Sequence, residues 1–253
     1  MINFFGKPGQ KILQDFNRET LTYRVLPHLI MDVLRKYFRL EIEGAENIPR
    51  RGAALIAPNH SGYSGIDAMM LAHCVYREAR RVPRILAHHF WFLTQTTAIP
   101  AQKLGFTDAS FENGIKFLEK NSVVIIFPEG EKGNFKPTSK AYQLQEFRRG
   151  FVRMALKTQS PIVPTLIIGA EETHINLSQV RFTKYLRGVV LPLPLNLLPL
   201  PVKWKIKFLT PIYLPYKPSA IEDNALVHEI AMDIQEQMQD ALTEEVQRRS
   251  IFF

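Results

Sequence analysis

Short apolar runs alternate along the chain with segments of helical periodicity. The clearest strand is SVVIIF at 122–127, because four β-branched residues stand in a row. Further strands are predicted at 40–44, 53–58, 84–91, 161–169 and 202–214, the last of them as an edge or half-exposed strand because it alternates. Helices are predicted between and after them, at 67–78, 110–120, 141–157 and 219–249. This alternation predicts an α/β fold, a mostly parallel sheet covered by helices on both faces.

An amphipathic helix is predicted before the first strand. Its apolar stripe consists of Leu26, Leu29, Ile30, Val33, Leu34 and Tyr37. Such a stripe more often faces a core than a membrane, but the flanking cations suit a lipid surface; they are Arg24, Arg35, Lys36 and Arg39. We expect residues 1–39 to form an N-terminal helical membrane-associating segment and residues 40–253 to form a single α/β domain.

Composition narrows the class of protein. The 253 residues are 46% hydrophobic and 22% charged, which is typical of a folded domain, and their mean hydropathy of -0.09 excludes a polytopic membrane protein. No apolar run approaches the ~18 residues of a spanning helix. The single Cys74 excludes an internal disulfide and a Cys-rich zinc site, and no other metal site is expected. The segment MINFFGKPGQK lacks signal-peptide architecture, so the cytoplasm is the expected compartment.

Positive charge is concentrated in one stretch. The net charge is +8, and residues 173–221 contain no aspartate or glutamate. The cations of this stretch are Arg181, Lys184, Arg187, Lys203, Lys205, Lys207 and Lys217. In its middle, GVVLPLPLNLLPLPV at 188–202 is apolar but contains four prolines, which predicts a loop that either dips into a bilayer or packs on the domain.

We expect the leucines of this loop to face a membrane; they are Leu191, Leu193, Leu195, Leu197 and Leu198. The surrounding cations would then meet anionic head groups. Nucleic acid is not an expected partner, because no aromatic residues are interleaved with these cations. The protein is therefore expected to lie on the cytoplasmic face of a membrane as a peripheral protein.

Two loops at carboxyl ends of predicted strands carry candidate chemistry. In the first, 59–67, His60 could act as a general base supported by Asp67. On a continuous helix these two would lie ~10 Å apart along the axis. Gly62 and Gly65 would allow the chain to fold back and bring Asp67 from the first turn of a helix. The structural alternative is a capping box formed by Ser64 and Asp67.

These loops resemble motifs of the glycerolipid acyltransferase family, which includes 1-acylglycerol-3-phosphate acyltransferases. NHSGYSGID at 59–67 is similar to the family's Asn-His motif in the variant with six residues between histidine and aspartate. FPEGEKG at 127–133 and PIVPTLIIGAEE at 161–172 are similar to two further blocks, in the family's order.

The resemblance implies transfer of a fatty acyl group from acyl-CoA or acyl carrier protein to a hydroxyl of a lysophospholipid or related glycerolipid. His60 would remove the hydroxyl proton and Asp67 would orient His60, with direct attack on the thioester and no cofactor besides the acyl donor. The acceptor would be bound at the second loop by Glu129 and Gly130.

The family's second block usually carries an arginine for the acceptor phosphate, and Phe111 stands near that position. The cations that could replace it are Lys103, Lys132, Lys136, Arg148 and Arg149. Two alternatives use the same features. A lipid hydrolase or thioesterase would use His60 to activate water, and a non-catalytic lipid-binding module would need only the basic apolar surface.

Overall fold

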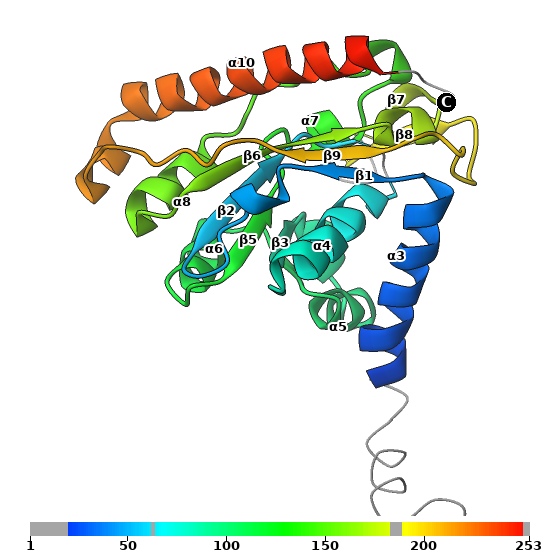
Figure 1. Cartoon of the computed structure of the whole chain (residues 1–253), viewed down its shortest axis with the longest axis horizontal. Coiled ribbons are helices and arrows are strands. Elements are labelled where there is room, and N and C mark those ends of the chain that lie inside the picture. Colours follow the sequence, from blue (N-terminus) through cyan, green and yellow to red (C-terminus); the bar gives the residue numbers. More distant parts are fainter. Residues whose placement is uncertain (1–19, 62–63, 183–188, 250–253) are drawn as a thin grey trace, which may run out of the picture.

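The computed structural model describes residues 20–61, 64–182 and 189–249. Its centre is a seven-stranded sheet in the order β1-β9-β6-β2-β5-β3-β4 (Figure 1). The strands are β1 (Glu41–Glu43), β2 (Ala54–Pro58), β3 (Arg84–Ala87), β4 (Phe106–Asp108), β5 (Val123–Ile126), β6 (Ile162–Ile168) and β9 (Lys205–Phe208). Neighbouring strands are parallel except β6 and β9, which are antiparallel.

Helices cover both faces of this sheet. The helices are α3 (Leu26–Tyr37), α4 (Ile66–Ala79), α5 (Gln95–Lys103), α6 (Phe111–Leu118), α7 (Glu131–Asn134), α8 (Gly150–Thr158), α9 (Ala170–Thr173) and α10 (Asn224–Arg248). Shorter helical turns lie at Leu21–Val25, Ala45–Asn47, His89–Phe92, Thr138–Lys140 and Pro218–Glu222. In β2, Ala54 and Ile56 pack with α4, whereas Leu55 and Ala57 pack with α8 and α10. The predicted α/β fold is confirmed.

Three predicted elements are much shorter than expected, and the strand predicted at 202–214 is reduced to Lys205–Phe208. The strand predicted at 84–91 ends at Ala87 and is followed by a helical turn. The helix predicted at 141–157 begins only at Gly150. In the residues before Gly150, four backbone N–H groups donate hydrogen bonds to side chains of other elements. The N–H groups of Tyr142 and Gln145 donate to Glu171 and Glu129. Those of Leu144 and Phe147 donate to Gln239 and Gln235. These tertiary bonds hold the segment in a non-helical conformation.

Strand β9 is an interior strand, so for Lys205–Phe208 the edge alternative is wrong and the half-exposed alternative is confirmed. Its alternation is confirmed, because Ile206 and Phe208 are buried and the lysines between them are partly exposed. The pairing with β1 on one side and β6 on the other explains how a half-polar strand lies inside the sheet.

The lysines of this strand are neutralised by acids from other parts of the chain. Lys205 and Lys207 each contact both Glu43 and Glu245, at 2.6–2.7 Å. Their hydrogen bonds lower the pKa of Glu43 to about 2. Lys203 contacts Glu41 at 2.6 Å. The three lysines, expected on a membrane-facing surface, therefore carry little net positive charge there.

The apolar segment at 188–202 is only partly a loop. Strand β8 (Val189–Pro194) pairs antiparallel with β7 (Asn176–Phe182), so the loop prediction is wrong for 189–194. A ribbon of two strands leaves every second N–H of β8 without a ladder partner, and proline is tolerated at such positions. Beyond the ribbon, Leu195, Leu197 and Leu198 are exposed, as is Leu193 at its end. The side chain of Leu191 lies outside those described.

Helix α3 stands at one side of the sheet, beside α4 (Figure 1). Most of its apolar stripe is exposed. The exposed residues are Leu26, Leu29, Ile30, Val33 and Tyr37, whereas Leu34 packs on the core. The core-facing alternative is therefore wrong for most of the stripe. Among the described residues, no helix has the length and apolar character needed to cross a membrane.

Candidate active site

His60 and Asp67 meet where the chain leaves β2 and enters α4. Gly65 caps the N-terminus of α4 with a left-handed backbone (φ 71°), so the chain folds back and Asp67 lies in the first turn. The His60 Nδ1 and Asp67 Oδ2 atoms are 2.7 Å apart. This fold-back confirms the expected juxtaposition; Gly62 lies outside the described residues.

The capping-box alternative for Asp67 is wrong. Ser64 does not cap α4, because Gly65 occupies the N-cap position. The Asp67 carboxylate instead accepts the N–H groups of Ser61 and Ala68, at 3.1 and 2.8 Å. These bonds fix the carboxylate beside the imidazole.

The imidazole of His60 is held and only partly covered. Its ring centroid lies 4.0 Å from that of Phe127, at the end of β5, and 14% of its side chain is exposed. Because Nδ1 contacts Asp67, Nε2 is the nitrogen left to take a proton from a bound molecule. The arrangement has the geometry of a general base with an orienting carboxylate.

Glu129 follows Phe127 and is completely buried. Its Oε1 accepts the backbone N–H of His60 at 2.8 Å, and its Oε2 accepts the N–H of Gln145 at 2.7 Å. A carboxylate with both oxygens bonded beneath the surface is not placed to contact an acceptor. Glu129 was expected to contact the acceptor, but in the structure it contacts the backbone of His60.

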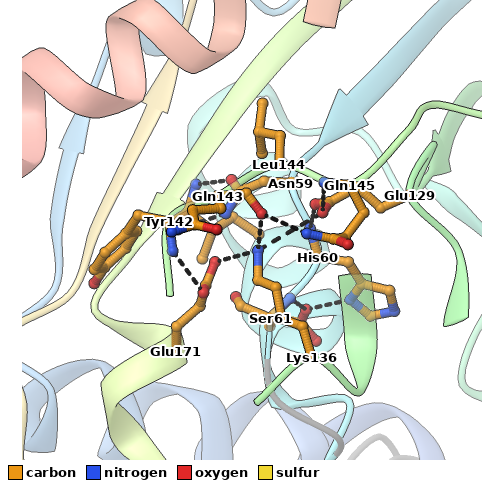
Figure 2. A network of polar contacts seen from close by, with 12 residues as sticks. Asn59, His60, Ser61, Glu129, Lys136, Tyr142, Gln143, Leu144, Gln145 and Glu171 are labelled. Carbon is orange, nitrogen blue, oxygen red and sulfur yellow. Dashed lines mark hydrogen bonds and ion pairs between the residues drawn. The ribbon is translucent and has the colours of Figure 1, made fainter. Parts of the chain in front are cut away.

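Lys136 is also buried, which corrects its expected role in acceptor binding. Its Nζ lies 2.9 Å from Glu171 Oε1 and 3.6 Å from Glu129 Oε2, and it donates to the carbonyl of Gln143 at 3.2 Å. Figure 2 shows the ammonium group between the two carboxylates. Burial raises the pKa of Glu171 to about 7.

Gly130 and Lys132 lie at the surface side of the same loop. Gly130 has a positive φ (+57°), and the Arg148 guanidinium lies 3.1–3.5 Å from where a Cβ would stand. Lys132 is exposed and contacts Glu146 at 3.3 Å. An open hollow of ≈ 330 Å³ adjoins them, lined by Lys132, Glu146, Phe147, Arg148 and Arg149. Most of its charged groups are cationic.

Lys103 is not brought to this loop. It ends α5, which Figure 1 shows well apart from α7, and its Nζ lies 5.0 Å from the centroid of the Tyr23 ring. Phe111 begins α6 and packs against the core beneath α8 and α10. Of the five cations expected to replace the arginine of the second block, Lys132, Arg148 and Arg149 line the hollow beside this loop.

Two residues that the sequence analysis left without a role shape the site. Asn59 is fully buried and bonds to the backbone of Ile167. Gly133 lies against Glu129, so that a Cβ there would come within 2.5 Å of the Glu129 Cβ. The sequence signal that could have identified both residues is their position within the Asn-His and FPEG blocks. In the described part of the chain, no group of three or more His, Cys, Asp or Glu side chains could bind a metal ion.

Comparisons with known proteins identify a family and several relatives. The model of the family described as Acyltransferase matches residues 39–168. An uncharacterised protein of Mycobacterium tuberculosis is 37% identical over 239 residues, which are 89% of this chain and 67% of that protein. A 1-acyl-sn-glycerol-3-phosphate acyltransferase of Bacillus subtilis is 25% identical over 150 residues, which are 58% of this chain and 71% of that protein.

The fold is also similar to a solved structure. The crystal structure of the 1-acyl-sn-glycerophosphate (LPA) acyltransferase PlsC from Thermotoga maritima has a TM-score of 0.58 and 17% identity, covering 96% of this chain and 89% of that one. At that identity the likeness shows the fold. The family match spans β1 to β6 and includes His60, Asp67 and Glu129. The chain belongs to the Acyltransferase family.

Proposed function

We propose that this acyltransferase moves a fatty acyl group from the thioester of acyl-CoA or acyl carrier protein to a hydroxyl of a lysophospholipid or related glycerolipid. The observation that carries the proposal is the 2.7 Å contact between His60 Nδ1 and Asp67 Oδ2, within a domain of the Acyltransferase family. A partly exposed imidazole with a buried carboxylate partner is suited to activate a hydroxyl.

The reaction then follows from the position of the imidazole. His60 Nε2 takes the hydroxyl proton as the acceptor oxygen attacks the thioester carbonyl carbon. The new C–O bond forms, the C–S bond breaks, and the departing thiolate receives the proton from the imidazolium. Asp67 holds the Nδ1–H and stabilises the cation that forms during transfer.

We further propose that a phosphate group of the acceptor binds in the hollow beside Gly130. The cations that line it are Lys132, Arg148 and Arg149, and an arginine guanidinium can bind a phosphate through two hydrogen bonds. Because Gly130 has no Cβ, the guanidinium of Arg148 can lie directly over the loop backbone. This placement supports binding of an anionic acceptor beside the FPEG block, whose Glu129 bonds to the backbone of His60.

A membrane-docking surface is proposed on α3 and the segment 193–200. Leucines 193, 195, 197, 198 and 200 are exposed there, as is the outward stripe of α3. The two elements are joined, because the Tyr37 hydroxyl donates to the Pro199 carbonyl at 2.7 Å and Arg39 donates to the Pro201 carbonyl at 2.8 Å. Exposed apolar side chains on adjacent elements suit peripheral burial in a lipid interface.

The catalytic proposal is tested by acyl transfer to a panel of lysolipids, with both donor types. His60→Ala is expected to reduce turnover by at least ~10²-fold. His89→Ala is the matched control, since His89 faces Asp108 at 3.4 Å on the exposed surface. Retained turnover in His60→Ala would refute the mechanism. Release of free fatty acid without use of any acceptor would instead support a hydrolase.

The membrane proposal is tested separately by sedimentation with phosphatidylglycerol-containing vesicles. Val33→Asp and the double variant Leu197→Asp/Leu198→Asp are expected to reduce the bound fraction. Met232→Asp is the control, because Met232 is an exposed apolar residue on α10. Equal sedimentation of all variants would exclude this surface.

A further inference from the structure

We propose that Glu129 is a positioning residue that sets the place of His60 through its backbone N–H. This inference rests on the proposed role of His60 in acyl transfer. It assigns to the glutamate of the FPEG block a role in turnover and removes it from acceptor binding.

Two carboxylates from separate elements hold consecutive amides of the loop. Glu129 Oε1 accepts the N–H of His60 at 2.8 Å, and Asp67 Oδ2 accepts the N–H of Ser61 at 3.1 Å. Asp67 Oδ2 also contacts the His60 ring at 2.7 Å. Glu129 thus fixes the backbone of His60, and Asp67 fixes the orientation of its imidazole.

Glu129 can act as an anchor because it is itself fixed. Its second oxygen accepts the N–H of Gln145 at 2.7 Å and faces Lys136 Nζ at 3.6 Å. Gly133 packs so closely on its side chain that any Cβ would displace it. Figure 2 shows how Glu129 joins the His60 loop to the segment at Gln145.

Charge and burial both argue against contact of Glu129 with the acceptor. A fully buried carboxylate requires hydrogen bonds and a counter-charge, and the backbone amides and Lys136 supply them. A carboxylate would also repel a phosphate group on the acceptor. The buried ammonium is in turn held by Glu171 and the Gln143 carbonyl, which completes an interior network.

Substitutions at Glu129 separate positioning from binding. Glu129→Asp keeps the charge opposite Lys136 but withdraws the carboxylate from the His60 amide by one methylene. Glu129→Gln sets its NH₂ group against one of the two backbone N–H donors. Because small displacements of a reacting group are costly, we expect kcat to fall roughly 10- to 100-fold in each variant. The KM for the acceptor should stay within about twofold. Glu119→Gln, at an exposed carboxylate, is the control.

The experiment measures kcat and the acceptor KM of each variant after circular dichroism has verified its fold. Glu129→Asp is the variant that conserves the charge. A wild-type kcat in Glu129→Asp, or a rise in acceptor KM with kcat unchanged, overturns the proposal. Lys132→Ala should give the opposite result, a raised acceptor KM, because its ammonium lines the hollow.

A second readout does not depend on the substrate. The downfield proton NMR resonance of the His60–Asp67 hydrogen bond is identified by its loss in His60→Ala. It should shift or broaden in Glu129→Asp and remain unchanged in Lys132→Ala and Glu119→Gln. An unchanged resonance in Glu129→Asp overturns the positioning role. If the wild type transfers no acyl group but the resonance responds, the proposed function fails while the positioning role stands.

Discussion

Asn59 and Ile167 exchange two hydrogen bonds across the end of the sheet. Asn59 Oδ1 accepts the N–H of Ile167 at 2.6 Å, and Nδ2 donates to its carbonyl at 3.0 Å. Asn59 stands one residue beyond β2, and Ile167 lies in β6. The side chain therefore extends the ladder between these strands and fixes the point from which the His60 loop departs.

Asn59→Ala should destabilise the protein strongly. Two buried backbone groups of Ile167 would lose their partners, at a cost of about 2–4 kcal/mol in the free energy of unfolding. Urea denaturation measures this change. Asn59→Asp keeps an acceptor for the N–H but offers no donor to the carbonyl, and it should also be less stable than the wild type. A change in Asn59→Ala no larger than that of the exposed control Gln102→Ala would contradict the bridging role.

Asp67→Asn should lower turnover with little change in substrate binding. The amide NH₂ can donate to His60 Nδ1, which would leave the proton on Nε2, where the base must be free. We expect kcat to fall roughly 10²- to 10⁴-fold with KM nearly constant. Steady-state kinetics at several acceptor concentrations measure both constants. A variant with full kcat would show that Asp67 has no part in setting the tautomer.

The lysines of β9 should matter for stability and not for lipid binding. Lys205→Met/Lys207→Met leaves Glu245, which is nearly buried, without its cations. The free energy of unfolding should drop on the order of 1–3 kcal/mol, since these partly exposed pairs are partly screened. Vesicle sedimentation of the folded variant should equal that of the wild type. A clear loss of sedimentation would return these lysines to the membrane surface.

Glu171 should make stability depend on pH near neutrality. Its pKa is about 7 in the folded chain, above its ordinary value of 4.5, because the side chain is buried. The folded state therefore holds a proton that the unfolded state releases, and the stabilisation present at low pH is lost as the pH rises through 7. Relative to Glu171→Gln, the wild type should lose on the order of 1–3 kcal/mol between about pH 5 and pH 8. Denaturation curves across this range that remain parallel for both proteins would contradict the prediction.

The central strands could be predicted because their signal is local. The runs at 53–58, 122–127 and 161–169 are apolar throughout, as strands covered on both faces must be, and the structure places β2, β5 and β6 there. Strand β4 was missed because it is only three residues long. The β7–β8 ribbon was missed because the prolines in β8 favour a loop. The segment before Gly150 has a helical pattern, but side chains from α10 and other elements bind its amides.

At the candidate site, the sequence supported the pairing of His60 with Asp67, since glycines permit a fold-back between them. It did not separate buried charges from exposed ones. Lys132 and Lys136 are four residues apart and looked equivalent, yet one lies on the surface and the other between two carboxylates. Burial of Lys136 depends on Glu129, which lies on the other side of α7, and on Glu171 in the distant helix α9, so the residues next to Lys136 do not indicate it.

The pairing of β1 with β9 constrains the order in which the chain can fold during synthesis. Glu41 is in register with Lys205, and in the described sheet β9 is the neighbour of β1. The ribosome must therefore make more than 160 further residues before β1 can pair, which makes its closure a late, long-range event. During that interval the exposed apolar stripe of α3, which we propose to bind lipid, has already been synthesised. Membrane contact by the nascent chain would then precede completion of the sheet.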